Sequence, residues 1–166
     1  MIAPTLQWIA IFFVALAAQA SLMPVIAIGG ITPDLVLASL FLLSLRHGML
    51  AGVYAGFLVG VCQDIYSPVV LGQFALSKSV TGFIMGIFND RIMRTDPLVK
   101  AALMLFLFVF HDTIFSLVDV FKHDLDMGST LLPLLTRSIP RALYSLLVVA
   151  MVYLWRHFIS PSPLRR

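Results

Sequence analysis

Residues 48–64 read GMLAGVYAGFLVGVCQD, an apolar stretch in which a glycine recurs at every fourth position. Because positions four apart lie on one face of an α-helix, the stretch predicts a helix with one bare face. That face consists of Gly48, Gly52, Gly56 and Gly60, with Asp64 at the next step. Small residues at this spacing let two membrane helices bring their backbones close together. The face is therefore expected to pack against another helix of this chain, or to receive a partner helix or a lipid.

The rest of the chain is similarly apolar. Of its 166 residues, 60% are hydrophobic and 11% are charged, and the mean hydropathy is +1.01. A soluble domain carries about 25% charged residues, and a chain this apolar would expose large hydrophobic patches in water. The composition predicts an all-α polytopic membrane protein and not a soluble enzyme. The Lys and Arg residues are scattered, so no nucleic-acid-binding surface is expected.

Six apolar segments approach the length of about 20 residues that a membrane-spanning helix needs. They are residues 6–28, 32–45, 49–63, 74–88, 98–121 and 131–158. Residues 1–159 are thus predicted to form a single six-helix transmembrane domain, and residues 160–166 a short cytoplasmic tail. The first helix is expected to be retained, because no Lys or Arg precedes its apolar run as in a signal peptide.

Prolines mark several of the predicted helix ends. Pro24 should kink the first helix or end it early, and Pro140 should bend the last one. Thr32 is expected to cap the second helix, with Pro33 at its first position and Asp34 favoured by the positive end of its dipole.

The distribution of positive charge predicts the orientation in the membrane. With six spans, one side holds Arg46, Arg91, Arg94, Lys100, Arg156, Arg165 and Arg166. The other side holds Lys122 as its clear loop cation. Since cytoplasmic loops carry the excess of Lys and Arg, both termini are predicted to be cytoplasmic.

In the last two predicted helices, the candidates for charges within the membrane are His111, Asp112, Asp119, Arg137 and Arg141. An unpaired charge at the bilayer centre costs at least about 2.5–3.5 kcal/mol. Counting the rise along each helix places Asp112 and Arg141 at similar depths, so they are the expected ion pair. Asp119 and Arg137 are expected to form a second pair nearer the outer surface. Two interpretations remain open: structural pairing, or a polar cavity that faces a ligand or a partner.

A second row of residues at four-residue spacing occurs on the fourth predicted helix. It consists of Lys78, Gly82, Gly86 and Asp90. Asp64 and Lys78 flank the turn before this helix and are expected to pair with each other across it.

No arrangement typical of an enzyme or a metal site is present. The pairs His111-Asp112 and His123-Asp124 lie at different predicted depths, so no metal ion is expected. Cys62 is the only cysteine, which excludes an intramolecular disulfide, and its apolar surroundings predict a buried thiol. No catalytic set and no cofactor site can be assigned.

Several short elements follow one another between residues 31 and 90: Pro33-Asp34-Leu35, Leu45-Arg46-His47-Gly48, the row Gly52, Gly56, Gly60 and Asp64, then Leu71-Gly72 and Ala75-Leu76. Their order and spacing resemble the rod shape-determining protein MreD family. The helices outside this region agree with the family in length and apolarity only. The resemblance therefore gives no role to Asp112, Arg137 or Arg141.

The resemblance implies a non-enzymatic part of the bacterial cell-elongation (rod) complex in the inner membrane. It implies MreC as the closest partner, through its single membrane helix, together with the MreB cytoskeleton, the polymerase RodA and a penicillin-binding transpeptidase. The implied role is to link MreB to peptidoglycan synthesis and cell-shape control. The implied fold is similar to that of the S components of energy-coupling-factor transporters.

Other functions remain open at this point. The alternative is a substrate-binding S component of an energy-coupling-factor vitamin transporter, motivated by six helices and intramembrane charges. A third possibility is a lipid-binding role, since Arg137 and Arg141 lie four residues apart and arginine matches phosphate geometry. A homo-oligomer is compatible with the sequence as well.

Overall fold

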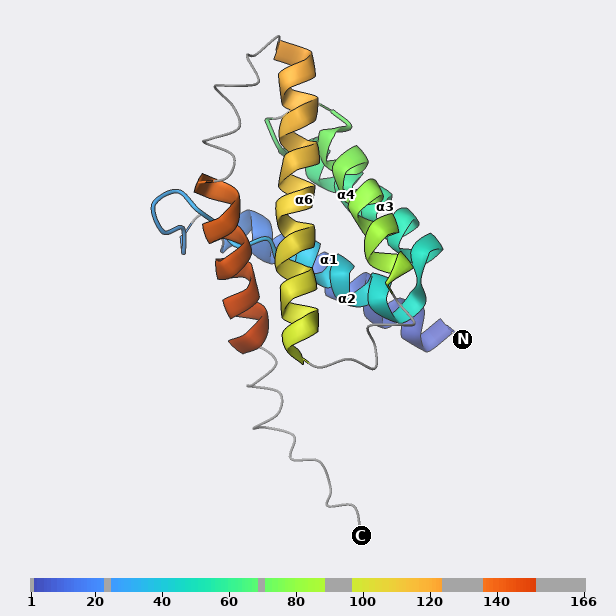
Figure 1. The fold of residues 1–166 in the computed structure, drawn as a ribbon. Coiled ribbons are helices and arrows are strands. Elements are labelled where there is room, and N and C mark those ends of the chain that lie inside the picture. The colour runs from blue at the N-terminus through green and yellow to red at the C-terminus, as the bar shows by residue number, and fades with distance from the viewer. Residues whose placement is uncertain (1, 23–24, 69–70, 89–96, 124–135, 152–166) are drawn as a thin grey trace.

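The computed structural model describes residues 2–22, 25–68, 71–88, 97–123 and 136–151 (Figure 1). Its elements are α1 (Ile2–Ser21), α2 (Leu35–His47), α3 (Met49–Tyr66), α4 (Gln73–Ile87), α6 (Pro97–His123) and a further helix over residues 136–151. Within these residues every extended element is a helix, and the only β-type pairing described is an isolated bridge between Ile28 and Ile31. The prediction of an all-α chain is therefore confirmed for this part of the protein.

Two of the helices are long and apolar enough to cross a membrane, Met49–Tyr66 and Leu98–Phe121. Leu6–Ser21 and Leu35–His47 are shorter apolar helices. At a rise of about 1.5 Å per residue, the 13 residues of α2 extend about 20 Å, whereas the hydrocarbon core is about 30 Å thick. The set of six spans stays a prediction, and part of the sixth, with the 160–166 tail, lies outside the described residues.

The start of α2 differs from the expectation based on Thr32 and Pro33. The helix begins at Leu35, and Asp34 is its N-cap, with an Oδ1 that accepts the backbone N–H of Leu37 at 2.8 Å. A carboxylate at the cap satisfies one of the free N–H groups of the first turn, so the helix begins one residue after the aspartate. By contrast, α1 ends at Ser21, ahead of Pro24, as the sequence predicted.

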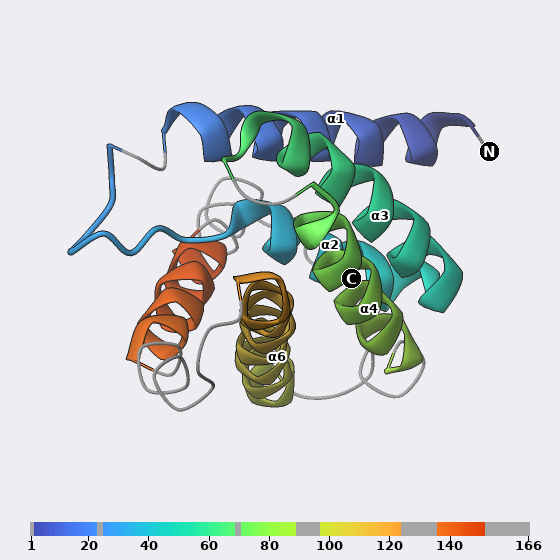
Figure 2. The same ribbon diagram turned by 90° about the horizontal axis from the view of Figure 1, so that it is seen from above.

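The helices are arranged around α2, which contacts α1, α3, α4 and α6. In Figure 2, α6 is seen nearly end-on, and α1 runs lengthwise along the side of the molecule opposite α6. The helix of residues 136–151 lies beside α6 in both views (Figures 1 and 2). Segments that are far apart in the sequence therefore enclose the start of α2.

Apolar side chains are divided between a core and an outer surface. Val36 and Leu40 of α2, Met85 of α4 and Leu107 of α6 are fully buried. Many large apolar side chains on α3 are exposed, among them Leu50, Tyr54, Phe57, Leu58 and Ile65. A surface of this kind is unfavourable in water and favourable against lipid chains.

The glycine rows pack against each other within this chain. A Cβ atom added at Gly52 would overlap the backbone carbonyl of Gly82, and one at Gly82 would overlap that of Gly52. Added Cβ atoms at Gly56, Gly60 and Gly86 would overlap the backbones of Lys78, Ala75 and Met49 respectively. The bare face of α3 is therefore covered by α4, so a partner helix cannot occupy it while this pair is formed.

Two other glycines of the motif act through their backbone conformation. Gly48 separates α2 from α3 with a φ of 83°, and its N–H donates to the Ser44 carbonyl at 2.9 Å. Gly72 is the N-cap of α4 with a φ of 94°. Residues with a Cβ rarely adopt a positive φ, so both positions favour glycine for the turn itself.

Candidate functional site

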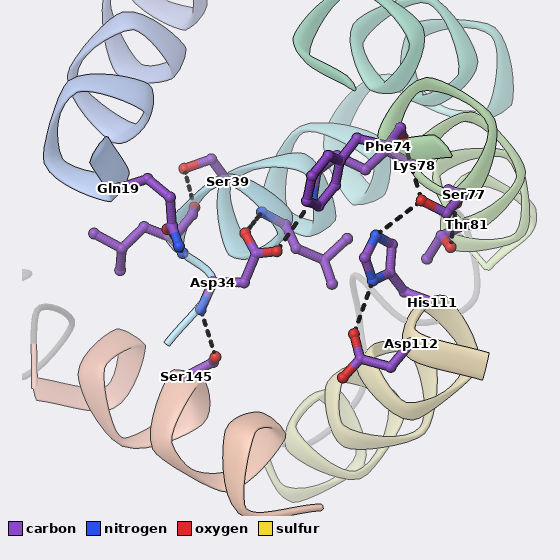
Figure 3. A network of polar contacts seen from close by, with 12 residues as sticks. Gln19, Asp34, Ser39, Phe74, Ser77, Lys78, Thr81, His111, Asp112 and Ser145 are labelled. Atoms are coloured by element: carbon purple, nitrogen blue, oxygen red, sulfur yellow. Dashed lines mark hydrogen bonds and ion pairs between the residues drawn. The ribbon is translucent and has the colours of Figure 1, made fainter. Parts of the chain in front are cut away.

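Asp34 is the centre of a network of polar side chains buried among the helices (Figure 3). One carboxylate oxygen caps α2 through Leu37, and the backbone N–H of Asp34 donates to Ser145 Oγ at 2.9 Å. The other carboxylate oxygen faces two cations. Only 1% of Asp34 is exposed, so protein groups must replace the hydration of its charge.

Lys78 supplies the nearest positive charge. Its Nζ lies 3.1 Å from Asp34 Oδ2, and its side chain is fully buried. The ammonium group also lies 5.5 Å from the centroid of the Phe74 ring, within the distance of a cation–π interaction. The prediction that Lys78 pairs with Asp64 is wrong, because α4 directs Lys78 inward to the start of α2.

Arg141 connects this pair to a second carboxylate. Its Nη2 lies 3.6 Å from Asp34 Oδ2, and its Nη1 lies 3.4 Å from Asp112 Oδ1. The Asp112–Arg141 pair expected from the matching depths is thus present. The Arg141 side chain is 30% exposed, whereas its Nε is buried with no hydrogen-bond partner among the described residues.

His111 joins α6 to α4 at the edge of the network. Its Nδ1 lies 3.1 Å from Asp112 Oδ1, and its Nε2 lies 3.3 Å from Ser77 Oγ (Figure 3). An ionised carboxylate only accepts hydrogen bonds, so Nδ1 of the ring donates to Asp112. The Ser77 hydroxyl donates to the Gln73 carbonyl at 2.8 Å, so His111 Nε2 lies beside the Ser77 oxygen and links α6 to α4 through this contact.

The four charged groups balance one another. Asp34 and Asp112 contribute two negative charges, and Lys78 and Arg141 contribute two positive charges. They come from the start of α2, from α6, from α4 and from helix 136–151. Removing one member of such a buried set leaves an uncompensated charge, so the network fixes four chain segments relative to one another. The geometry favours structural pairing over an open polar cavity.

Gln19 supports the turn that carries Asp34. Its Nε2 donates to the Pro33 carbonyl at 3.0 Å, and its Oε1 accepts the Leu35 N–H at 3.0 Å. The amide therefore satisfies the backbone on both sides of Asp34. In the sequence, the sign of this role is a polar residue within an otherwise apolar helix.

A stripe of polar residues on α4 was also missed. Gln73, Ser77 and Thr81 recur every four residues and are buried. Gln73 Nε2 donates to the Phe115 carbonyl at 2.9 Å, and Thr81 Oγ1 donates to the Ser77 carbonyl at 2.7 Å. Their regular spacing was the signal that could have identified the face of α4 that meets α6.

Asp64 has a different role from the expected ion pair. Its two carboxylate oxygens accept the backbone N–H groups of Phe74 at 3.0 Å and of Ala75 at 3.1 Å. Gly72, the N-cap residue of α4, offers no side-chain acceptor. Asp64 of α3 therefore caps the start of α4 from a distance, where a negative charge is also favoured by the helix dipole.

Asp64→Ala is expected to lower the free energy of unfolding by about 1–2 kcal/mol, the range for the loss of an N-cap. Amide hydrogen exchange in detergent should show faster exchange for Phe74 and Ala75, because their N–H groups lose an acceptor. Asp64→Asn keeps one acceptor oxygen and should give an intermediate effect. Unchanged exchange at Phe74 and Ala75 in Asp64→Ala would contradict this role.

The remaining candidates are Asp119, Arg137, Asp90 and Cys62. Asp119 is partly buried and Arg137 is exposed, and the pairing of these two residues stays a prediction. Asp90 lies outside the described residues. Cys62 is exposed, so the prediction of a buried thiol is wrong. It lies four residues after Leu58 on the exposed face of α3, outside the protein core.

Comparisons with known proteins give one result. No curated protein and no solved structure matches the chain. A family model described as rod shape-determining protein MreD matches residues 1–159.

Among the described residues, no group of three His, Cys, Asp or Glu side chains could hold a metal ion.

Proposed function

Because the chain belongs to the rod shape-determining protein MreD family, we propose that it is a non-enzymatic membrane scaffold of the bacterial elongation complex. In this role it binds MreC and links the MreB cytoskeleton to peptidoglycan synthesis by RodA and a penicillin-binding transpeptidase. The family match over residues 1–159 is the observation that carries the proposal. Members of this family are membrane proteins that determine rod shape.

The geometry supports the scaffold role, in which this protein holds other proteins in place. The buried charges satisfy one another, and the glycine rows lock α3 to α4. Both features make the interior rigid and leave no polar group of the network free to bind a substrate, apart from the partly exposed Arg141. Partners then bind to the outer surface, which is largely apolar.

The proposed location is the inner membrane, with several spans and both termini in the cytoplasm. It is supported by the two helices of sufficient length and by the excess of Lys and Arg on one side of the predicted topology. With cytoplasmic termini, Arg46 at the end of α2 faces the cytoplasmic leaflet.

We place the MreC helix on the outer face of α3. The glycine face is already covered by α4, so the partner must use another surface. The exposed side chains Leu50, Tyr54, Phe57 and Leu58 lie at spacings of three and four residues and form an apolar stripe. Two aromatic side chains in this stripe offer a large contact area to a neighbouring helix.

Photo-crosslinking in cells tests this placement. A photoreactive phenylalanine analogue at Tyr54 is expected to crosslink to MreC, since the side chain is 68% exposed on the stripe. The matched control is Phe106 of α6, which is 62% exposed but outside the stripe, and should give little MreC product. Equal yields at the two positions would contradict the placement on α3, and failure of the intact chain to co-purify with MreC would contradict the scaffold.

The transporter alternative gains no support from the described residues. It was based on a set of intramembrane charges that could bind a substrate, and three of them, Lys78, Asp112 and Arg141, have charged partners within the protein. A vitamin that co-purifies with the protein in a one-to-one ratio would revive it and would argue against the scaffold.

A further inference from the structure

A pocket lies between the first turns of α1 and the last turn of α2. It is lined by Gln7, Trp8, Ala10, Ile11 and Arg46 and has a volume of about 410 Å3. The pocket is shallow and open to the surface, so a ligand would contact it on one side only. The pocket is remote from the charge network, and the proposed scaffold role does not use it.

Arg46 contacts an aromatic ring, and it has no anionic partner among the described residues. Its guanidinium carbon lies 5.7 Å from the centroid of the Trp8 ring, and the His47 ring meets the Trp8 ring edge-on at 5.6 Å. Among the described residues, no hydrogen bond or ion pair reaches the exposed Arg46 guanidinium. A guanidinium has five N–H donors in a planar fork that matches phosphate oxygens, so this site offers unused donors to an anion.

The surroundings of the pocket distinguish a lipid from a soluble anion. Leu6 and Ile9, next to the lining residues on α1, are 63% and 61% exposed, and Met49 beyond Arg46 is also exposed. Exposed apolar side chains beside a Trp and an Arg are typical of the membrane–water interface, where acyl chains continue from a charged headgroup. Gln7 adds an amide donor at the same level.

We propose that this pocket binds the phosphate of an anionic phospholipid in the cytoplasmic leaflet. Arg46 contacts the phosphate oxygens, Gln7 donates a further hydrogen bond, and the acyl chains extend along Leu6 and Ile9. The negative end of the α2 dipole lies beside the site and opposes an anion, so binding depends strongly on the Arg46 charge. The proposal depends on the membrane location and not on the binding of MreC.

Quenching of Trp8 fluorescence by brominated lipids tests the proposal directly. The chain has two tryptophans, so a Trp155→Phe background leaves Trp8 as the reporter. The protein is reconstituted in phosphatidylcholine membranes that contain a small fraction of brominated phosphatidylglycerol or, in parallel, of brominated phosphatidylcholine. About fivefold enrichment of phosphatidylglycerol near Trp8 is expected, which corresponds to about 1 kcal/mol for one arginine at the membrane surface.

Three variants separate the specific contact from a general effect of charge. Arg46→Gln should reduce the enrichment to onefold, and Arg46→Lys should retain part of it because the charge remains without the fork. Lys100→Gln removes a cation from the same predicted side but not from the pocket, and should preserve the enrichment. Quenching by brominated phosphatidylcholine checks that each variant still inserts in the same way.

Three results would overturn the proposal. The first is equal quenching of Trp8 by the two brominated lipids, and the second is undiminished enrichment in Arg46→Gln. The third is loss of the enrichment on addition of inorganic phosphate at constant ionic strength, which would assign the pocket to a soluble phosphate compound. Enrichment that requires Arg46 and resists inorganic phosphate supports the lipid site.

Discussion

Gly52→Leu is expected to prevent α3 and α4 from packing, so that no stably folded protein is obtained. A Cβ at this position overlaps the backbone of Gly82 and lies 2.6 Å from Ser44 Oγ, and a leucine adds three more carbons there. A backbone atom in the middle of a helix cannot move aside as a flexible side chain can. The variant should accumulate poorly in membranes and elute as aggregate from a sizing column in detergent.

Gly52→Ala tests the same contact with a smaller loss of stability, which can be measured as a free energy of unfolding. Alanine improves the helix propensity by about 1 kcal/mol, whereas overpacking in a tight interface costs about 1–3 kcal/mol. The clash at Gly52 involves backbone on the opposing helix, so the upper end of that range applies and a net loss of about 2 kcal/mol is expected. Unfolding in mixed micelles with increasing dodecyl sulfate measures this loss.

The matched control lies on the other side of the same helix. Tyr54→Leu changes an exposed residue and should alter the free energy of unfolding by less than about 0.5 kcal/mol. If Gly52→Ala were as stable as the unchanged protein, the close approach of α3 and α4 would be refuted. If both variants lost stability equally, the effect would not be specific to the glycine face.

Lys78→Met is expected to lower the free energy of unfolding by about 3–5 kcal/mol, the typical result of breaking a buried ion pair. The methionine fills a similar volume, but Asp34 then keeps a negative charge that only the more distant Arg141 faces. Asp34→Asn should be destabilising too, because it leaves Lys78 charged and fully buried. The asparagine retains an oxygen that can cap α2, so the loss of the charge is isolated from the loss of the cap.

The double variant distinguishes a pair from two independent residues. Asp34→Asn combined with Lys78→Met removes one charge of each sign and leaves the Arg141–Asp112 pair neutral. The double variant should therefore be at least about 1 kcal/mol more stable than the sum of the single effects predicts. Leu147→Met, at a position of helix 136–151 that is 67% exposed, is the control and should change stability by less than about 0.5 kcal/mol. Strict additivity would show that Asp34 and Lys78 do not interact.

Local features of the sequence predict the helical class and the ends of single helices. The all-α class follows from composition, and the observed ends of α2, α3, α4 and α6 lie within about three residues of the predicted ones because glycine, proline and charged residues mark them. The pairing of Asp112 with Arg141 could be predicted because both lie on consecutive helices. Their depth could therefore be counted along the chain.

The predicted pair between Asp64 and Lys78 is wrong for a physical reason. Asp64 was the nearest carboxylate along the chain, and proximity in sequence suggested a pair across the turn. In the folded protein the backbone N–H groups at the start of α4 occupy Asp64, and the partner of Lys78 lies 44 positions away at Asp34. A lysine in an apolar helix shows that a carboxylate must be near, but it does not identify which one.

The sequence by itself determined that this protein belongs in a lipid environment and is helical. It also determined that charges must be neutralised inside the protein. These properties depend on the residue types and on the periodicity of a single helix. Only the tertiary structure decided that the glycine face of α3 is covered by α4, and that Asp34 joins Lys78 and Arg141. Both outcomes depend on how separate helices pack, and many pairings of small or charged residues satisfy the same one-dimensional pattern.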